Sequence, residues 1–228
     1  MNLKKSNVVD SAVAHSYGVN QEALIPFFVT EEGARYSWHS CSHFLVSKKG
    51  LDSRINLPKD YDQFDETGTR KKPPVLILPR GIGARHFCCY NELDGFSSSC
   101  VDVYSTNGTK LTDNVLRLWT YMNSSLFWLI REISGRKNLG GGMLKAEAVD
   151  IKSFAILFDF DKMDDIKQVF SEASKKEILN AQQEILTECH QKIDKIVFDY
   201  LGFSDEERTY IVQSLTNTVN ARYSKTKN

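Results

Sequence analysis

A glycine-rich, basic stretch is the first candidate for chemistry in this sequence. Its residues are Arg136, Lys137, Asn138, Gly140, Gly141, Gly142 and Lys145. Glycine lets a backbone approach a ligand closely and exposes its N–H groups. Arginine, lysine and asparagine side chains contact phosphates and base edges in DNA. The stretch is compatible with a DNA contact, and also with a plain connection between a helix and a strand.

The spacing of these glycines argues against a phosphate-binding P-loop. Such a loop has a glycine, four further residues and then Gly-Lys-Ser/Thr, because the lysine and the hydroxyl contact the nucleotide and Mg²⁺. Gly135 and Gly140 have this separation, but Gly141 and Gly142 stand where the lysine and the hydroxyl are needed. The stretch also follows a predicted helix and not a strand, so no nucleotide site is predicted here.

A second glycine turn, Gly81-Ile82-Gly83, follows a predicted strand. A dinucleotide fingerprint requires a third glycine three residues later and then a helix. His86 occupies that third position, and a strand is predicted after it. Arg80 and Arg85 flank the turn and can reach a phosphate or a guanine, or pair with a surface carboxylate.

Two further groups of side chains could bind metal. His39, Cys41 and His43 are two residues apart and would share one face of a strand, but the chain has no partner pair with zinc-finger spacing. The acidic clusters at 60–66 and 161–165 could serve a metal-dependent nuclease. The first cluster falls in a predicted loop and the second at a helix start, where acids favour the dipole. Solvated side chains are the favoured interpretation of both clusters.

Hydrophobic patterns predict the elements that must position these residues. Strands are predicted at 75–78, 85–90 and 99–104, with a tight turn at Asn107-Gly108 and an exposed loop at 57–73. One helix is predicted from a cap at Thr112 or Asp113 to Gly135. Trp119 and Trp128 are expected to belong to the core and not to stack on bases. A short helical turn and one more strand are expected between this helix and Asp161.

The chain becomes helix-rich from Asp161 onward. Gly202 is a natural helix stop, and Ser204 with Glu207 forms a capping box that starts a final helix. Residues up to 155 carry 19 Lys+Arg against 16 Asp+Glu, and the remainder carries 10 against 13. The difference permits a basic working face in the first part and an acidic helical second part.

Composition suits a soluble globular protein. The chain has 228 residues, 41% hydrophobic and 25% charged, and no apolar run reaches the roughly 18 residues that span a bilayer. Its first residues contain no apolar stretch typical of a signal peptide. The odd count of five cysteines without framework spacing predicts a reduced, cytoplasmic protein.

The order of several segments resembles a known family. The segments are "LILPRGIGARHFCCYNELDGFSSSCVDVYS" and "LRLWTYMNSSLFWLIREISGRKNLGGGMLKAEAVDIKSFAI", preceded by "EALIPFFVTEEGARYSW". Together with the helical tail they resemble the C-terminal target recognition domain of adenine-specific DNA methyltransferases of the TaqI-like, or fused restriction-methylase, type. The resemblance covers roughly residues 15–225.

The sequence departs from the catalytic half of that family. There an Asn/Asp-Pro-Pro-Tyr/Phe motif grips the flipped adenine, and a glycine-rich motif binds S-adenosylmethionine. Here Pro73-Pro74 stands between Lys72 and Val75, which supply neither the amide nor the aromatic ring, and no methyl-donor motif is visible. The resemblance therefore implies a specificity portion that is not itself an enzyme. S-adenosylmethionine would bind the catalytic half or partner.

These inferences define the expectations for the structure. The fold is expected to be α+β, with a mixed-sheet DNA target recognition domain at 1–160 and a helical region at 161–228 that packs on it or docks a partner. The expected partners are double-stranded DNA and a methyltransferase, and the alternatives are a small metal-dependent nuclease and a protein-interaction subunit. The predicted DNA contacts are Arg80, Arg85, His86, Asn91, Arg136, Lys137, Asn138, Gly140, Gly141, Gly142 and Lys145.

Overall fold

The computed structural model describes residues 73–92, 100–137, 142–155 and 160–224 with their side chains. It also describes the backbone of four short strands, β1 (Val8–Asp10), β2 (Leu24–Phe28), β3 (His43–Val46) and β7 (Phe96–Ser97). Two residues of the candidate metal set lie outside the described residues, His39 and Cys41. The acidic cluster at 60–66 lies outside them too.

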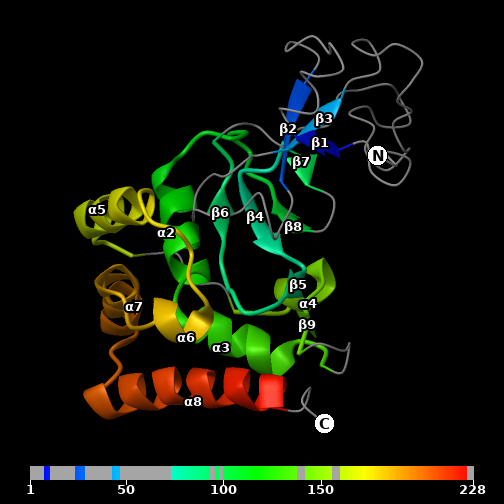
Figure 1. Cartoon of the computed structure of the whole chain (residues 1–228). Helices are drawn as coiled ribbons and strands as arrows, with labels where there is room; N and C mark the ends of the chain where they lie inside the picture. Colours follow the sequence, from blue (N-terminus) through cyan, green and yellow to red (C-terminus); the bar gives the residue numbers. More distant parts are fainter. Residues whose placement is uncertain are drawn as a thin grey trace.

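The described strands form three small sheets (Figure 1). β4 (Leu76–Pro79) is the centre of an antiparallel sheet, between β6 (Cys89–Tyr90) and β8 (Cys100–Val103). A four-stranded sheet has the order β1-β3-β2-β7, in which β2 and β7 run parallel and the other pairs antiparallel. The third sheet pairs β5 (Gly81–Ile82) with β9 (Leu144–Lys145). The predicted α+β class with mixed sheets is confirmed.

The predicted strand at 85–90 is shorter than expected. Only β6 at its end pairs with β4. Before it, the backbone of Cys88 bonds a side chain: Cys88 N donates to Asn123 Oδ1 at 2.9 Å, and Asn123 Nδ2 donates to Cys88 O at 3.1 Å. Because this amide satisfies the peptide groups of Cys88, no strand partner is needed there.

The single helix predicted at 112–134 is two helices, α2 (Asp113–Met122) and α3 (Ser125–Ser134). Thr112 caps the first, as expected, and Ser124 caps the second by accepting from Phe127 N at 3.3 Å. The expectation of one helix was wrong because apolar residues recur at helical spacing on both sides of the break, from Val115 to Met122 and from Leu126 to Ile133. Ser and Asn favour helix ends, which is the local signal for the break.

Two predicted boundaries of the later helices are present, the stop at Gly202 and the start of the final helix at Ser204. These helices are α4 (Ala148–Lys152), α5 (Met163–Ala173), α6 (Ala181–Glu184), α7 (Glu188–Leu201) and α8 (Asp205–Ser224). Gly202 ends α7 with a left-handed φ of 69°. The capping box is present, since Ser204 N donates to Glu207 Oε2 at 2.7 Å and Glu207 N to Ser204 Oγ at 3.3 Å.

One main hydrophobic core runs through the helices and the central sheet. It contains Trp119 and Trp128, as predicted, together with residues of α5, α7 and α8. Figure 1 shows α8 lying along α3, at the edge of the molecule farthest from β1 and β2. The α8 residues Ile211, Leu215 and Val219 are buried at helical spacing. The main core therefore includes residues from both sides of position 160.

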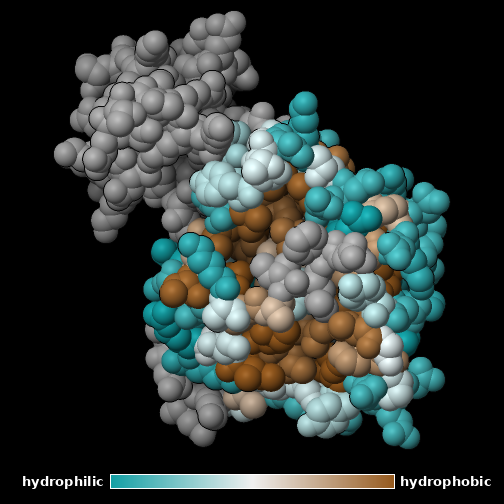
Figure 2. Space-filling view, turned by 180° about the vertical axis from the view of Figure 1, so that it is seen from behind, coloured by the Kyte–Doolittle hydropathy of each residue, from teal (hydrophilic) through white to brown (hydrophobic). Residues whose placement is uncertain are grey.

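An apolar area lies on the face seen from behind (Figure 2). On α3 the side chains that point away from the core also include apolar residues, and Ile133 is 66% exposed. Val149 of α4 is exposed to the same degree, 66%. Exposed apolar areas are typical of surfaces that contact another molecule.

We expect α8 to depend on its apolar contact with α3. Leu215→Ala should lower the free energy of unfolding by about 2–5 kcal/mol, because the side chain is 1% exposed and its loss leaves a cavity. Leu186→Ala removes the same atoms from a side chain that is 73% exposed, and should change stability by less than about 0.5 kcal/mol. Urea unfolding of both variants tests this, and equal losses would contradict the packing.

Candidate nucleic-acid interface

The glycine turn at 81–83 and the basic stretch at 136–145 meet in space. β5 and β9 pair antiparallel, with Gly81 opposite Lys145 and Ile82 opposite Leu144. On the other side of β9, Arg136 N donates to Lys145 O at 2.8 Å and Lys145 N donates to Arg136 O at 3.0 Å. The backbone of Lys145 is thus held between two segments that are far apart in the sequence.

This pairing gathers four of the predicted DNA contacts, which we call the basic ribbon: Arg80, Arg136, Lys137 and Lys145. The side chains of Arg80, Arg136 and Lys145 are 43%, 56% and 38% exposed, and Lys137 is also exposed. Exposed cations that lie close together can attract a polyanion.

Two acidic residues at the start of α4 pair with the basic ribbon. Glu147 lies 2.6 Å from Lys145 Nζ and 3.7 Å from Arg80 Nε, and Asp150 lies 3.4 Å from Arg136 Nη2. The hydrogen bond from Lys145 lowers the pKa of Glu147, and the bond from the Glu147 N–H lowers the pKa of Asp150. Such exposed ion pairs are weak and can give way to a phosphate.

A buried arginine holds the backbone beneath the basic ribbon. Arg222 of α8 donates to Ile82 O at 3.2 Å and Gly83 O at 3.1 Å, and it also donates to Gly142 O. Its charge is balanced by Glu132 of α3, with Nη2 to Oε1 at 2.7 Å and Nε to Oε2 at 3.2 Å. One guanidinium therefore fixes both the glycine turn and the glycine-rich stretch.

His86 and Asn91 lie in the interior, where they cannot contact DNA. Both are 0% exposed. His86 Nε2 lies 2.8 Å from Glu132 Oε1, and burial lowers the pKa of His86 to about 4, so the ring is neutral and donates this hydrogen bond. Asn91 Nδ2 donates to Pro74 O at 2.7 Å. Burial contradicts the expectation for these two residues, because each side chain serves the fold.

The other predicted contacts have different outcomes. Arg85 is partly buried, with its guanidinium 5.7 Å from the centre of the Phe87 ring. Gly142 is buried with φ 70°, and a Cβ there would lie 2.9 Å from the Tyr223 ring, so glycine is required by the turn. Asn138, Gly140 and Gly141 lie outside the described residues.

The residues that organise this site have few recognisable signals in the sequence. Arg222 continues the buried stripe of α8, three residues after Val219. Glu132 lies on the buried side of α3. A charge at a core position is the one available signal, because core positions rarely hold unpaired charges. Glu147 and Asp150 have no such signal, since exposed acids are common.

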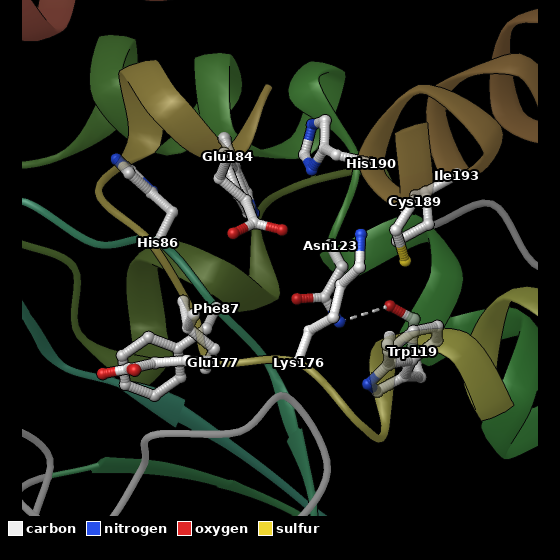
Figure 3. A pocket seen from close by; sticks show the side chains of 13 residues that line it. His86, Phe87, Trp119, Asn123, Lys176, Glu177, Glu184, Cys189, His190 and Ile193 are labelled. Carbon is white, nitrogen blue, oxygen red and sulfur yellow. Dashed lines mark hydrogen bonds between the residues drawn. The ribbon is translucent and has the colours of Figure 1, made fainter. Parts of the chain in front are cut away.

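A small cavity lies beside His86 (Figure 3). Its volume is about 30 Å³, and His86, Asn123, Glu184 and His190 line it from four segments. Two buried polar atoms of its lining, His86 Nδ1 and Trp128 Nε1, have no hydrogen-bond partner among the described residues. Since one water molecule needs about 10–15 Å³, the cavity has room for one or two waters and not for a nucleobase.

A serine, a histidine and an aspartate also meet inside the protein, in an arrangement that the sequence did not suggest. Ser125 Oγ lies 2.9 Å from His190 Nε2, and Asp194 Oδ2 lies 3.5 Å from the same nitrogen. A catalytic triad needs the acid on the other ring nitrogen, and the serine accessible. Here Ser125 is 0% exposed. Asp194 instead accepts from Ser125 N at 2.7 Å and so joins α7 to the start of α3.

Within the described part of the chain, no group of three or more His, Cys, Asp or Glu side chains is arranged to hold a metal ion. Asp161, Asp164 and Asp165 are exposed at the start of α5. Of the helices described, none has the length and apolar character needed to cross a membrane.

The low pKa of His86 predicts a specific pH dependence of stability. Its ordinary value is 6.5 and its value in the fold is about 4. Between these values the unfolded chain binds a proton that the folded chain excludes, so stability falls as pH falls. This residue alone should cost about 2 kcal/mol between pH 7 and pH 5.

The matched variant is His86→Gln, which keeps a donor for Glu132 and does not titrate. Urea unfolding at pH 7 and pH 5 should give a smaller loss for this variant than for the wild type. Equal losses would mean that His86 does not contribute to the acid sensitivity.

Comparison with known proteins gives a likeness in fold. No protein-family model matches the chain, and no curated protein matches it. Among solved structures, the chain is similar to the type IIG restriction endonuclease BpuSI, with a TM-score of 0.64 and 12% sequence identity. The match covers 96% of this chain and 28% of that one. The chain thus spans about 28% of the length of this enzyme and shares the fold of that part.

Proposed function

We propose that this chain is a sequence-specific DNA recognition module of a restriction-modification system. The observation that carries the proposal is the basic ribbon, in which Arg80, Arg136 and Lys145 are exposed beside one strand pairing and the exposed Lys137 follows Arg136. Arginines can pair with guanine in the major groove, and lysines can hold phosphates. The likeness in fold to part of a restriction endonuclease supports the same conclusion.

The finer form of the proposal is a specificity portion that works with an adenine-N6 methyltransferase. Its support is the resemblance of the sequence to target recognition domains, and the absence from the sequence of the Asn/Asp-Pro-Pro-Tyr/Phe motif. In this proposal S-adenosylmethionine binds the catalytic half or partner. The catalytic half then transfers the methyl group, and this chain positions it at the target sequence on the DNA.

A protein-interaction subunit without DNA contact is the second candidate. It is favoured by the apolar area of Figure 2, because such areas often mark protein interfaces. The two candidates differ in one measurable property. A DNA recognition module binds duplex DNA with an affinity that falls steeply with salt, and an interaction subunit does not.

We expect the double variant Arg136→Ala/Lys145→Ala to weaken duplex binding and its salt dependence. Each lost phosphate contact lowers the slope of log affinity against log salt by about 0.9, so two contacts lower it by about 2. Fluorescence anisotropy with a random-sequence duplex over a salt series gives this slope. The control is Lys167→Ala, since Lys167 is 54% exposed and also pairs with a carboxylate, that of Asp113. Equal slopes in all three proteins would contradict the assigned surface.

Glu147→Gln should have the opposite effect. This change removes a negative charge that lies between Arg80 and Lys145 and competes with phosphate. Because exposed ion pairs are weak, the variant should bind the same duplex up to about fivefold more tightly. Glu188→Gln, which removes an exposed carboxylate paired with Lys192 on α7, is the matched control. Weaker binding by the Glu147 variant would show that this carboxylate contributes to binding.

A further inference from the structure

One apolar side chain lies among the cations of the basic ribbon. Met143 directly precedes β9 and is 41% exposed. Successive side chains of a strand alternate between its faces. Leu144 is 0% exposed and points inward, so Met143 and Lys145 share the outward face.

Arg136 and Gly81 complete this outward face. Both lie directly opposite Lys145 across the two ladders, and residues that are directly opposite share a face of the sheet. The face therefore carries Arg136, Lys145 and Met143, and it has no side chain at Gly81. Two cationic side chains and one apolar side chain thus share this face.

The Met143 side chain lies over the glycine. A Cβ at Gly81 would be 3.5 Å from Met143 Sδ, which is an ordinary van der Waals contact. The thioether is therefore held against the ribbon and does not project beyond it. A side chain that inserts between stacked base pairs must project from the protein. The position of Met143 instead favours contact with the edge of a base pair in a groove.

We propose that Met143 contacts the 5-methyl group of a thymine in the major groove, an inference that rests on the proposed function. The major groove admits a two-stranded β-ribbon, and the thymine methyl is the apolar feature that a side chain can read there. Methionine is flexible and polarisable, which suits contact with a single methyl group. Arg136 and Lys145 on the same face would hold the flanking phosphates or guanines.

The test compares duplex pools that differ only in this methyl group. The purified chain is used to select from a random duplex library made with thymidine and from one made with deoxyuridine in its place. We expect one thymine position of the selected motif to lose enrichment in the uracil library. At that position a uracil should weaken binding by about three- to fivefold, the effect of one buried methyl group.

Met143→Ala should select the other positions of the motif and should bind thymine and uracil equally at this one. Met143→Gln, which has nearly the same length, should also lose the discrimination, and a normal thermal unfolding transition establishes that each variant is folded. Leu186→Ala is the control, because Leu186 is 73% exposed and lies on the α6–α7 connection.

The outcomes separate the inference from the proposed function. If the wild type selects a motif but treats both libraries alike, or if the Met143 variants keep the discrimination, the methyl contact is wrong and the recognition function stands. If the wild type selects no motif from either library, the recognition function fails and this inference fails with it.

Discussion

The ion pair between Arg222 and Glu132 is the interaction on which the arrangement of the basic ribbon depends. Both side chains are buried, and removing either one would leave an uncompensated charge, which costs about 3–5 kcal/mol. The remaining donors of the guanidinium bond the carbonyls of Ile82, Gly83 and Gly142. The pair thus ties α8 and α3 to two loops that have little regular structure of their own.

Two kinds of ion pair serve different purposes here. The hydrogen bonds from His86 and Arg222 hold the pKa of Glu132 below its usual value, although burial acts in the opposite direction. The buried pair of Arg222 and Glu132 keeps the backbone of the two loops in place. The outer pairs of Glu147 and Asp150 are exposed and weak, so the cations remain available to a stronger anion.

In the interior, several side chains of types that occur in active sites stabilise the fold instead. Ser125, His190 and Asp194 meet without solvent access, and their hydrogen bonds link α7 to the first turn of α3. Burial raises the pKa of Asp194 because the carboxylate loses its hydration. A polar cluster in a dry core stabilises the packing of its helices when its members satisfy one another.

The sequence by itself determined the elements whose patterns are local. The caps at Thr112 and Ser204 and the stop at Gly202 follow from backbone chemistry within a few residues, and the structure has them. The apolar spacing predicted the buried side of α2, but on α3 it included Ile133, which is exposed. It also predicted Trp119 and Trp128 in the core, and both side chains are buried there.

Only the tertiary structure decided which predicted residues share a surface. The sequence placed His86 and Arg136 in one candidate set, since their types suit DNA, but it could not separate a buried ring from an exposed guanidinium. That difference depends on Arg222, which is distant in sequence and pairs with Glu132 behind the ribbon. Long-range contacts of this kind have no local pattern, because they result from how α3 and α8 pack together.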